Sequence, residues 1–394
     1  MHLGLYDEPV HTDGRGFDTY GPFARLVLAL ARHFDQVTVF APTTDQPTYF
    51  SGAPLDAPNI CIAPLPFFMT HAGAMVRAPA VCRVFRRHAG RLDAVLVRST
   101  APLAYLLWLM TRRRGVPFMY LFAEDPFEMI ARSPKYRGPY RWFARAAYGV
   151  EFAIQKHIMR RAYSFTAGRA LYEKMRSITP RIEPAMKSTL NEEDYYPRQD
   201  SCTGSPVRIL YVGYLRHGKG LEDLLEALRL LRDRGRAVEL DLVGDGERRE
   251  PLARQAAGSG LSDFVHFWGR TLMGPDLNAR YNAADLFALP SLSEGSPRAV
   301  LEAMGHSLPV VATPVGNIPD LLDEGRRGLL TPIHNAVALA DALERVLTDS
   351  DLRRRFIREG FAFARRHNAD AFARTVAERA KALAREQAGG MPST

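Results

Sequence analysis

Residues 290–305 have the sequence Pro-Ser-Leu-Ser-Glu-Gly-Ser-Pro-Arg-Ala-Val-Leu-Glu-Ala-Met-Gly, which joins an apolar run to an amphipathic segment. The run that ends at Pro290 predicts a buried strand, and Ser296 and Pro297 are typical of the cap and first position of a helix. A helix that begins at the carboxyl end of a strand presents free backbone N–H groups and a positive dipole end. The stretch therefore predicts an anion site, for example for phosphate, on the backbone of residues 295–298.

Two carboxylates border this predicted anion site. Glu294 directly precedes the helix, and Glu302 lies in its second turn. Carboxylates accept hydrogen bonds from hydroxyl groups, which a sugar and a ribose both offer. The alternatives are that Glu294 closes the loop and that Glu302 is an ordinary solvated helix position. We expect Glu302 to be a ligand rather than a core residue.

Short apolar runs alternate with amphipathic segments on both sides of this stretch. Most runs are continuous, which is typical of parallel strands buried on both faces. The expected strands are residues 2–7, 36–42, 59–65, 94–100, 117–124, 164–167, 207–215, 238–244, 264–269, 285–290, 309–314 and 328–332. The alternation predicts two doubly wound α/β domains, whose ligands bind outside the carboxyl ends of the strands.

The chain of 394 residues is long enough for two domains. A polar stretch over residues 191–206, broken by Pro and Gly, is the expected linker. We therefore expect an N-terminal domain over 1–195, a C-terminal domain over 205–370, and a terminal helix with a frayed tail over 371–394. The ligand is expected in a cleft between two facing domains.

The composition is that of a globular protein, with 46% hydrophobic and 24% charged residues. The three cysteines lie far apart, which argues against disulfides or a cysteine zinc site and favours a reducing cytoplasm. We expect no metal, because the Asp-Ser-Asp string at 349–351 is typical of a helix cap. The first eight residues do not resemble a secretory signal, and the apolar run 101–110 is shorter than the about 20 residues of a membrane span.

The net charge of +9 lies almost entirely in residues 1–200, which carry 26 Lys and Arg against 18 Asp and Glu. Such an excess indicates an anionic partner, which could be nucleic acid, acidic lipid or a phosphorylated metabolite. Residues 75–88 and 135–161 combine basic with apolar or aromatic side chains, as helices on an anionic membrane surface do. The alternative is a core helix with a solvated basic side.

The motifs around residues 290–305 resemble a known family. The spacing of Glu294 and Glu302, followed by Pro-Val-Val-Ala-Thr-Pro-Val-Gly at 309–316, is similar to the glutamate-x7-glutamate signature of family 4 glycosyltransferases. The supporting motifs, in the family's order, are Gly213, Lys219 with Gly220, Val-Gly-Asp-Gly at 243–246, Val-His-Phe-Trp-Gly at 265–269 and Ala-Asp-Leu-Phe-Ala-Leu-Pro-Ser at 284–291. The likeness covers nearly all of residues 205–335 and, more loosely, the remainder.

The resemblance implies the GT-B fold, in which two Rossmann-like domains face a cleft and a C-terminal helix packs back on the N-terminal domain. It also implies a retaining transferase that takes a sugar from a nucleoside diphosphate sugar, without a cofactor or metal. The acceptor would be a glycan or a lipid-linked glycan in polysaccharide or glycolipid assembly. The protein would be cytoplasmic, with peripheral contact at the inner membrane face through its basic N-terminal domain.

The resemblance assigns the donor to the C-terminal domain. Lys219 and an arginine would neutralise the diphosphate, which agrees with the need to stabilise a departing anion. The family's arginine follows the equivalent of Gly213, where this chain has Tyr214, so Arg216 is the candidate substitute. Glu302 would bind the ribose and Glu294 the donor sugar, as a catalytic residue. The other expected donor-binding residues are Gly244, Gly246, Arg270 in the turn 268–270 against the base, and Gly295, Ser296, Pro297 and Arg298 at the phosphates.

The N-terminal domain offers fewer matches. Gly14 and Gly16 correspond to a glycine-rich loop that approaches the donor, or are plain loop glycines ahead of a helix over 18–34. The family's histidine after the fifth strand is absent, and Glu124 or Asp125 could contact the donor sugar or act as the acceptor's base. A helix cap at Asp125 is an equal alternative.

Two alternative functions remain open. One is a GT-B epimerase, which is distinguished by needing no acceptor, and the other is a basic nucleic-acid-binding protein. A nicotinamide oxidoreductase is less favoured, because the chain lacks the full glycine fingerprint of that class.

Overall fold

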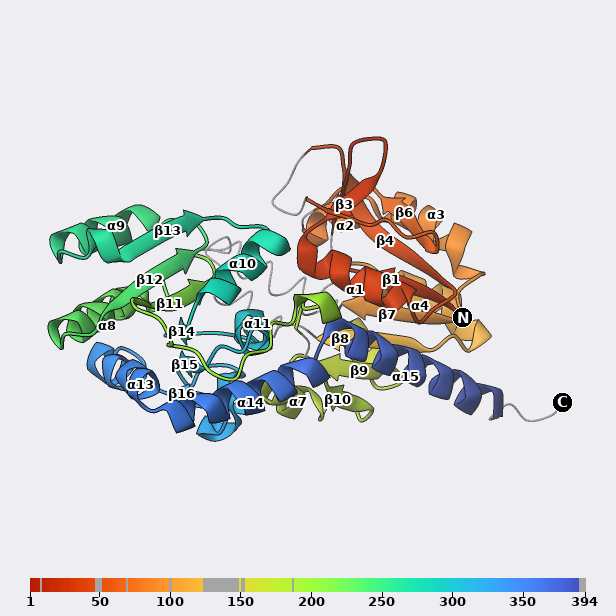
Figure 1. Cartoon of the computed structure of the whole chain (residues 1–394). Coiled ribbons are helices and arrows are strands. Elements are labelled where there is room, and N and C mark those ends of the chain that lie inside the picture. Colours follow the sequence, from red (N-terminus) through yellow and green to blue (C-terminus); the bar gives the residue numbers. More distant parts are fainter. Residues whose placement is uncertain are drawn as a thin grey trace. The chain divides into compact units, whose positions relative to one another are not determined.

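The computed structural model describes residues 1–7, 9–46, 52–68, 70–98, 101–122, 149, 153–185 and 188–389 (Figure 1). The chain forms two compact units. Unit 1 comprises Met1–Met186 and Ala369–Thr394, and unit 2 comprises Lys187–Asn368.

Unit 1 is built on a mainly parallel sheet. Its strands are β1 (His2–Tyr6), β2 (Val10–Thr12), β3 (Phe17–Thr19), β4 (Gln36–Thr44), β5 (Ala53–Pro54), β6 (Ile60–Leu65), β7 (Ala94–Arg98), β8 (Phe118–Phe122), β9 (Tyr163–Thr166) and β10 (Ile182–Pro184). The order is β10-β9-β8-β7-β1-β4-β2-β3-β5, with β6 also paired to β4. The parallel strands therefore extend in both directions from β1, as in a doubly wound fold.

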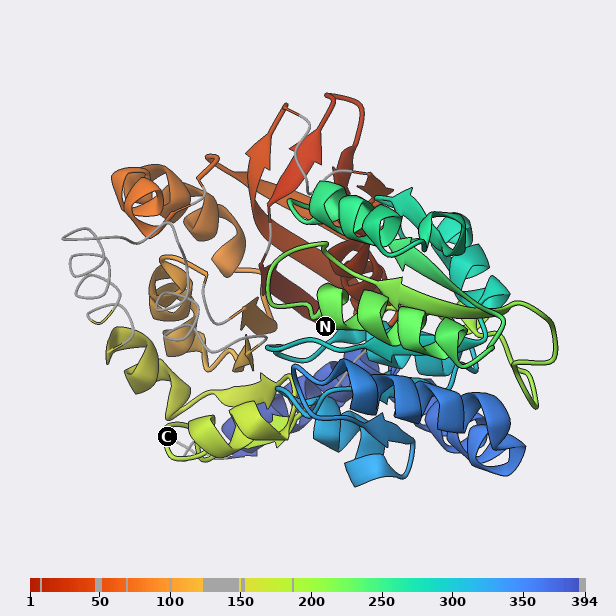
Figure 2. The same cartoon turned by 90° about the vertical axis from the view of Figure 1, so that its left-hand side faces the viewer.

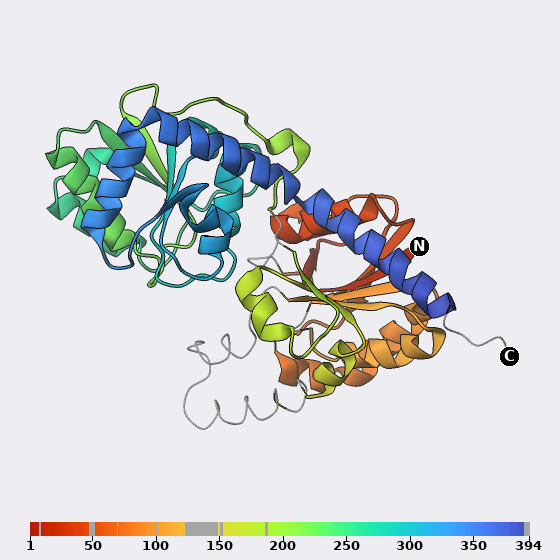
Figure 3. The ribbon, with the colours of Figure 1, turned by 90° about the horizontal axis from the view of Figure 1, so that it is seen from below.

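Each face of the unit 1 sheet has its own core. The helices of the unit are α1 (Gly21–Ala31), α2 (His71–Val76), α3 (Ala78–Ala89), α4 (Ala104–Thr111), α7 (Arg169–Met175) and α15 (Ala369–Gly389). Alternate residues of β1 point to opposite faces, so that Leu3 and Leu5 pack with α1 and α15 while Tyr6 packs with α3 and α4. Helix α15 runs beside α1 (Figure 3). The expected packing of a C-terminal helix on the N-terminal domain is therefore observed.

Unit 2 has a wholly parallel sheet. Its strands are β11 (Val207–Val212), β12 (Val238–Val243), β13 (Val265–Gly269), β14 (Leu286–Leu289), β15 (Val310–Ala312) and β16 (Gly328–Leu330). Its helices are α8 (Leu221–Asp233), α9 (Arg249–Gly258), α10 (Pro275–Ala283), α11 (Arg298–Gly305), α12 (Ile318–Leu322), α13 (Ala336–Thr348) and α14 (Ser350–Arg366). Helices α8 and α13 lie side by side in both side views (Figures 1 and 2).

The strand order in unit 2 is β13-β12-β11-β14-β15-β16. The first three strands extend in one direction from β11, and the last three extend in the other from β14. The connections therefore diverge between β11 and β14, which is the topological switch point where ligands bind in such sheets. This places the carboxyl ends of β11 and β14 at the candidate site.

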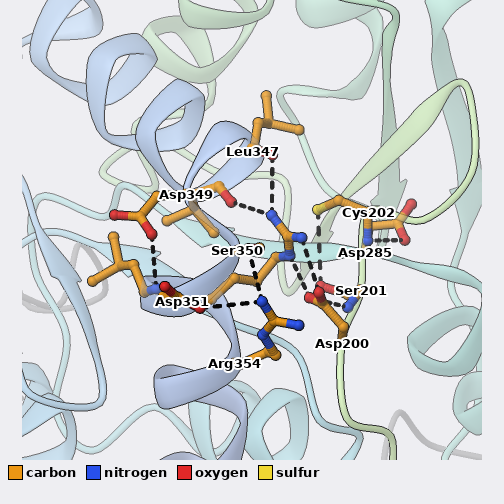
Figure 4. Close-up of polar contacts among 12 residues, drawn as sticks. Asp200, Ser201, Cys202, Asp285, Leu347, Asp349, Ser350, Asp351 and Arg354 are labelled. Atoms are coloured by element: carbon orange, nitrogen blue, oxygen red, sulfur yellow. Dashed lines mark hydrogen bonds and ion pairs between the residues drawn. The ribbon is translucent and has the colours of Figure 1, made fainter.

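The expected linker over 191–206 lies within unit 2, where side chains attach it firmly. Buried Arg353 donates two hydrogen bonds to Asp200, from Nε at 2.6 Å and from Nη2 at 3.1 Å, and further bonds to the carbonyls of Val346 and Leu347. The backbone N–H of Cys202 donates to Asp285 at 2.8 Å, beside Asp200 and Ser201 (Figure 4). The polar side chains of this segment therefore bind it to unit 2, and the segment is not a flexible linker.

Two of three local expectations differ from the structure, and the third is confirmed. Residues 17–19 form β3, so the first helix begins at Gly21 instead of residue 18. Helix α11 begins at Arg298, and its cap is Pro297 rather than Ser296, because the backbone at Gly295 is held by a bond from the N–H of Asn317 at 2.8 Å. Asp349 does cap α14, since its Oδ1 accepts from the N–H of Leu352 at 2.9 Å.

Within the described residues, no helix has the length and apolar character needed to cross a bilayer. The same residues contain no cluster of three or more His, Cys, Asp or Glu side chains suited to a metal ion.

Candidate functional site

The loops after the central strands of unit 2 are packed backbone against backbone. Gly244, directly after β12, has φ +142°, and a Cβ there would lie 1.9 Å from the carbonyl oxygen of Gly213. Gly220 has φ +64°, and a Cβ there would lie 2.0 Å from the carbonyl oxygen of Pro290. Only glycine allows such close approaches. The loop 213–220 is therefore fixed between the ends of β12 and β14.

Hydrogen bonds hold the same loop on both sides. The N–H of Leu215 donates to the carbonyl of Asp245 at 3.0 Å, and the N–H of Leu292 donates to the carbonyl of Gly218 at 2.9 Å. Gly246 also lies here, since a Cβ on it would meet the carbonyl of Leu215 at 2.4 Å. The predicted residues Gly213, Lys219, Gly244, Gly246 and Glu294 are thus brought together at the switch point.

Lys219 and Glu294 form an ion pair at this edge of the sheet. Lys219 Nζ lies 2.6 Å from Glu294 Oε1, and both side chains are only 11% exposed. Ser291 Oγ donates to the same oxygen at 2.6 Å. Among the described residues, both hydrogen bonds to this carboxylate go to Oε1, so Oε2 can accept one from a ligand.

Ser291 is a residue that the sequence alone did not assign. It is fully buried, and its carbonyl accepts a hydrogen bond from the hydroxyl of Thr313. Ser291 lies two residues after the end of β14 and three residues before Glu294. The place of Ser291 between the predicted strand and the predicted site residue Glu294 is the signal that could have indicated this contact.

Glu302 faces the interior of unit 2, contrary to our expectation that it is not a core residue. The residue is 6% exposed. Its Oε1 accepts from the hydroxyl of Thr189, and its Oε2 accepts from Tyr281 Oη at 3.0 Å. Burial, with a smaller contribution from the Glu302 charge, raises the pKa of Tyr281 well above its usual value. Residues 300–305 of α11 are all buried, and the two hydroxyl donors compensate the burial of the Glu302 carboxylate.

Residues near the end of β13 have their own contacts. Trp268 Nε1 donates to Asp241 Oδ1 at 2.7 Å, and the guanidinium of Arg280 lies 3.3 Å from the centre of the Trp268 ring. The indole is therefore attached to the sheet face, while Arg270 follows it at the surface. Around the start of α11, Gly295 and Arg298 are exposed and Ser296 and Pro297 are half-buried.

The predicted N-terminal site residues lie in unit 1 or outside the described residues. Gly14 and Gly16 form the tip of the hairpin between β2 and β3. The N–H of Gly16 donates to Asp13 Oδ1 at 3.0 Å, so this backbone group is already bonded. Glu124 and Asp125 lie outside the described residues.

A family comparison agrees with the geometry of unit 2. Residues 206–349 match the family model described as glycosyl transferases group 1. Among curated relatives, the amylovoran biosynthesis glycosyltransferase AmsK of Erwinia amylovora is 36% identical over 147 residues, which are 36% of each protein. The alpha-D-kanosaminyltransferase of Streptomyces kanamyceticus is 33% identical over 147 residues, 37% of this chain and 38% of the relative. The alignments thus span under half of these relatives' own length.

Solved structures extend the likeness to both units. A sucrose-phosphate synthase from Thermosynechococcus elongatus has a TM-score of 0.71 at 18% identity, covering 97% of this chain and 99% of its own. Anabaena HepE in complex with UDP-glucose has a TM-score of 0.68 at 17% identity, covering 97% and 100%. At these identities the likeness concerns the fold. The predicted fold class is confirmed: the chain has the GT-B fold of two Rossmann-like domains, and its residues 206–349 match glycosyl transferases group 1.

Proposed function

We propose that this protein is a retaining glycosyltransferase that moves a hexosyl unit from a nucleoside diphosphate sugar to an acceptor hydroxyl. The observation that carries the proposal is the buried pair of Lys219 and Glu294 at the switch point of unit 2. The names of AmsK and the kanosaminyltransferase, and the UDP-glucose in the HepE structure, support sugar transfer over epimerisation or nucleic-acid binding. The proposal includes the likeness to family 4 glycosyltransferases, which rests on the spacing of Glu294 and Glu302, and retention of the configuration at the anomeric carbon.

The reaction gives each residue a chemical task. The acceptor oxygen forms a bond to the anomeric carbon, and the bond from that carbon to the β-phosphate oxygen breaks. Lys219 stabilises the charge that develops on the departing diphosphate, together with backbone N–H groups at the start of α11. Glu294 accepts a hydrogen bond from a donor-sugar hydroxyl through Oε2. These cationic and backbone groups let the reaction proceed without a metal.

The acceptor proton needs a base. Glu124 and Asp125 remain the candidates by sequence, because they come two and three residues after Phe122, the last residue of β8, in the chain. We propose a glycan or lipid-linked glycan as the acceptor, in polysaccharide or glycolipid assembly. AmsK, whose name refers to amylovoran biosynthesis, supports this choice.

The test is turnover of defined donors by the purified chain. UDP-, GDP-, ADP- and dTDP-glucose are each offered with a simple glycoside acceptor, and release of the nucleoside diphosphate is followed. We expect one donor to react, with the product keeping the donor's anomeric configuration by NMR. Glu294→Gln should lower the rate by about 100-fold, as loss of a transition-state contact does. Glu250→Gln, at an 87% exposed position, serves as the control.

An inverted product would contradict the retaining mechanism, and equal rates for Glu294→Gln and the parent would contradict the role of Glu294. Reaction of the donor sugar without any acceptor, to give its epimer, would favour the epimerase alternative.

We further propose that the basic surface of unit 1 contacts the anionic inner face of the cytoplasmic membrane. Helix α2 exposes Met75 at 57% and Val76 at 79%, and exposed arginines follow at its end and along α3. These arginines are Arg77, Arg83, Arg86 and Arg87. Residues 71–91 contain no Asp or Glu. Apolar side chains between cations match the interface of an acidic bilayer. Most of the other basic stretch, 135–161, lies outside the described residues.

Vesicle co-sedimentation tests the membrane proposal. The chain should bind vesicles containing phosphatidylglycerol at low salt and dissociate as salt rises, because the attraction is screened. Arg86→Glu with Arg87→Glu should abolish binding. Arg254→Glu with Arg358→Glu, at exposed positions of unit 2, should not. Absence of binding at low salt, or equal loss in both double variants, would refute the proposal.

A further inference from the structure

The loop after β11 carries Tyr214 where the family resemblance leads one to expect an arginine. Tyr211, the buried residue that precedes this loop, is 0% exposed, and its hydroxyl donates to the carbonyl of Tyr214 at 3.0 Å. Tyr214 is 45% exposed. The guanidinium of Arg216 lies 5.9 Å from the centre of that ring, within the range of a cation–π contact.

Two charged residues of the site act electrostatically on the phenol of Tyr211. Burial raises its pKa, the charge of Glu294 raises it further, and the charge of Arg216 opposes this rise. The hydroxyl also limits the loop sterically, since a Cβ on Gly213 would lie 2.9 Å from it. Arg216 and Lys219 lie on the same loop, whose backbone is bonded by the Tyr211 hydroxyl at the carbonyl of Tyr214.

We propose that Tyr211 is a positioning residue for the donor site. Its hydroxyl fixes the carbonyl of Tyr214, the ring of Tyr214 supports Arg216, and Arg216 supplies the second cation for the donor diphosphate. This inference rests on the proposed function. It explains how a chain with tyrosine directly after Gly213 still presents two cations. Arg216 lies two residues after Tyr214 on the same loop, and a guanidinium binds phosphate through paired hydrogen bonds.

The first test removes only the hydroxyl of Tyr211. Tyr211→Phe should weaken binding of the nucleoside diphosphate by about three- to tenfold, the effect of one lost hydrogen bond. The KM for the donor should rise with kcat nearly unchanged, because the loop and not the reacting groups is displaced. Tyr195→Phe is the matched control: Tyr195 in unit 2 also donates to a backbone carbonyl, that of Ala364 at 3.1 Å. It should lose stability without losing nucleotide affinity.

A double-mutant cycle tests whether Tyr214 acts through Arg216. Calorimetry with UDP, GDP, ADP and dTDP first identifies the nucleotide that the parent binds. Arg216→Gln should weaken its binding by about tenfold, and Tyr214→Leu by less. The double variant should bind no worse than Arg216→Gln alone, since the ring has no role without the guanidinium.

The outcomes separate this inference from the proposed function. Additive losses in the cycle, or unchanged affinity in Tyr211→Phe, would overturn the inference while the parent still binds nucleotide. Failure of the parent to bind any of the four nucleotides would overturn both.

Discussion

The carboxylate of Glu302 holds two hydroxyl groups inside unit 2, those of Thr189 and Tyr281. Glu302→Ala would leave both hydroxyls without their acceptor and open a cavity. We predict a loss of about 3 kcal/mol in the free energy of unfolding, measured with urea. Glu302→Gln should lose less, because its amide oxygen can still accept one of the bonds.

Glu250→Ala, at a position 87% exposed, provides the comparison and should change stability by less than about 0.5 kcal/mol. A Glu302→Ala protein as stable as the parent would show that the carboxylate does not hold the core together.

The pair of Asp200 and Arg353 predicts a dependence on pH. Burial opposes ionisation of Asp200, but the hydrogen bonds from Arg353 and from the N–H of Ser201, together with the charge of Arg353, outweigh burial and lower the pKa of Asp200 below its usual value. Because the pKa of Asp200 is lower in the folded state than in the unfolded state, its ionisation stabilises the fold at any pH above the unfolded-state pKa of about 3.9. This stabilisation is lost as the pH falls through the folded-state pKa. Asp200→Asn should therefore be less stable than the parent at pH 7, with the difference shrinking below about pH 4.

Urea unfolding at pH 7 and at pH 3 measures this difference. Asp351→Asn, at a side chain 94% exposed, should show no comparable change between the two pH values. A constant difference between Asp200→Asn and the parent would contradict the prediction.

The site was predictable from the sequence only in part. Lys219 and Glu294 were identified by the motif and lie within hydrogen-bond distance. The burial of Glu302 was not predicted, because its partners Thr189 and Tyr281 lie 113 and 21 residues away in the chain. Contacts of that separation leave no periodic signal in a single sequence.

At the scale of elements, the loop after β12 depends on Gly244. A Cβ there would lie 1.9 Å from the carbonyl oxygen of Gly213, so one of the two loops must move. We predict that Gly244→Ala lowers stability by more than about 2 kcal/mol and weakens nucleotide binding. Gly260→Ala is the matched control, since Gly260 also has positive φ, at +67°, but no atom within 4 Å of its Cβ position.

Thermal unfolding and calorimetry of the two alanine variants measure this difference. Gly260→Ala should lose only about 1 kcal/mol in the free energy of unfolding, because alanine is unfavourable in the left-handed conformation, and it should bind nucleotide normally. Equal effects in the two variants would show that close loop packing is unimportant.

The elements were largely predictable because most central strands are continuous or nearly continuous apolar runs. The central strands agree with the predicted runs to within a few residues, as β4 and β12 illustrate. Strands β2, β3, β5 and β10 were missed, since each has two or three residues and no distinctive pattern. Local propensity placed the α11 cap at Ser296, but the bond from Asn317 to Gly295 holds that segment outside the helix.

At the scale of the whole molecule, α15 belongs to the fold of unit 1. Its residues Phe372, Val376 and Ala380 are 4% exposed or less and pack in one core with Leu3 and Leu5. A chain ending at Asn368 should therefore expose apolar surface in unit 1. We predict that it binds a hydrophobic dye and loses the cooperative unfolding of that unit. A chain ending at residue 389 should behave as the parent, and unchanged unfolding of the shorter chain would refute the prediction.

The sequence predicted two doubly wound domains followed by a terminal helix over 371–394. In the structure, α14 ends at Arg366 and α15 begins at Ala369. The break coincides with the return of the chain to unit 1. Which unit a helix joins depends on the core that it completes, and amphipathicity alone does not identify that core.

The most direct test of the central claim is calorimetric titration of nucleoside diphosphates into the parent, Lys219→Met and Arg254→Met. UDP is the first probe, followed by GDP, ADP and dTDP. We predict that the parent binds one of them, that Lys219→Met binds it at least about tenfold more weakly, and that Arg254→Met, 72% exposed on unit 2, binds normally. Binding of none by the parent, or equal affinity in all three proteins, would contradict a donor site at the β11 and β14 switch point.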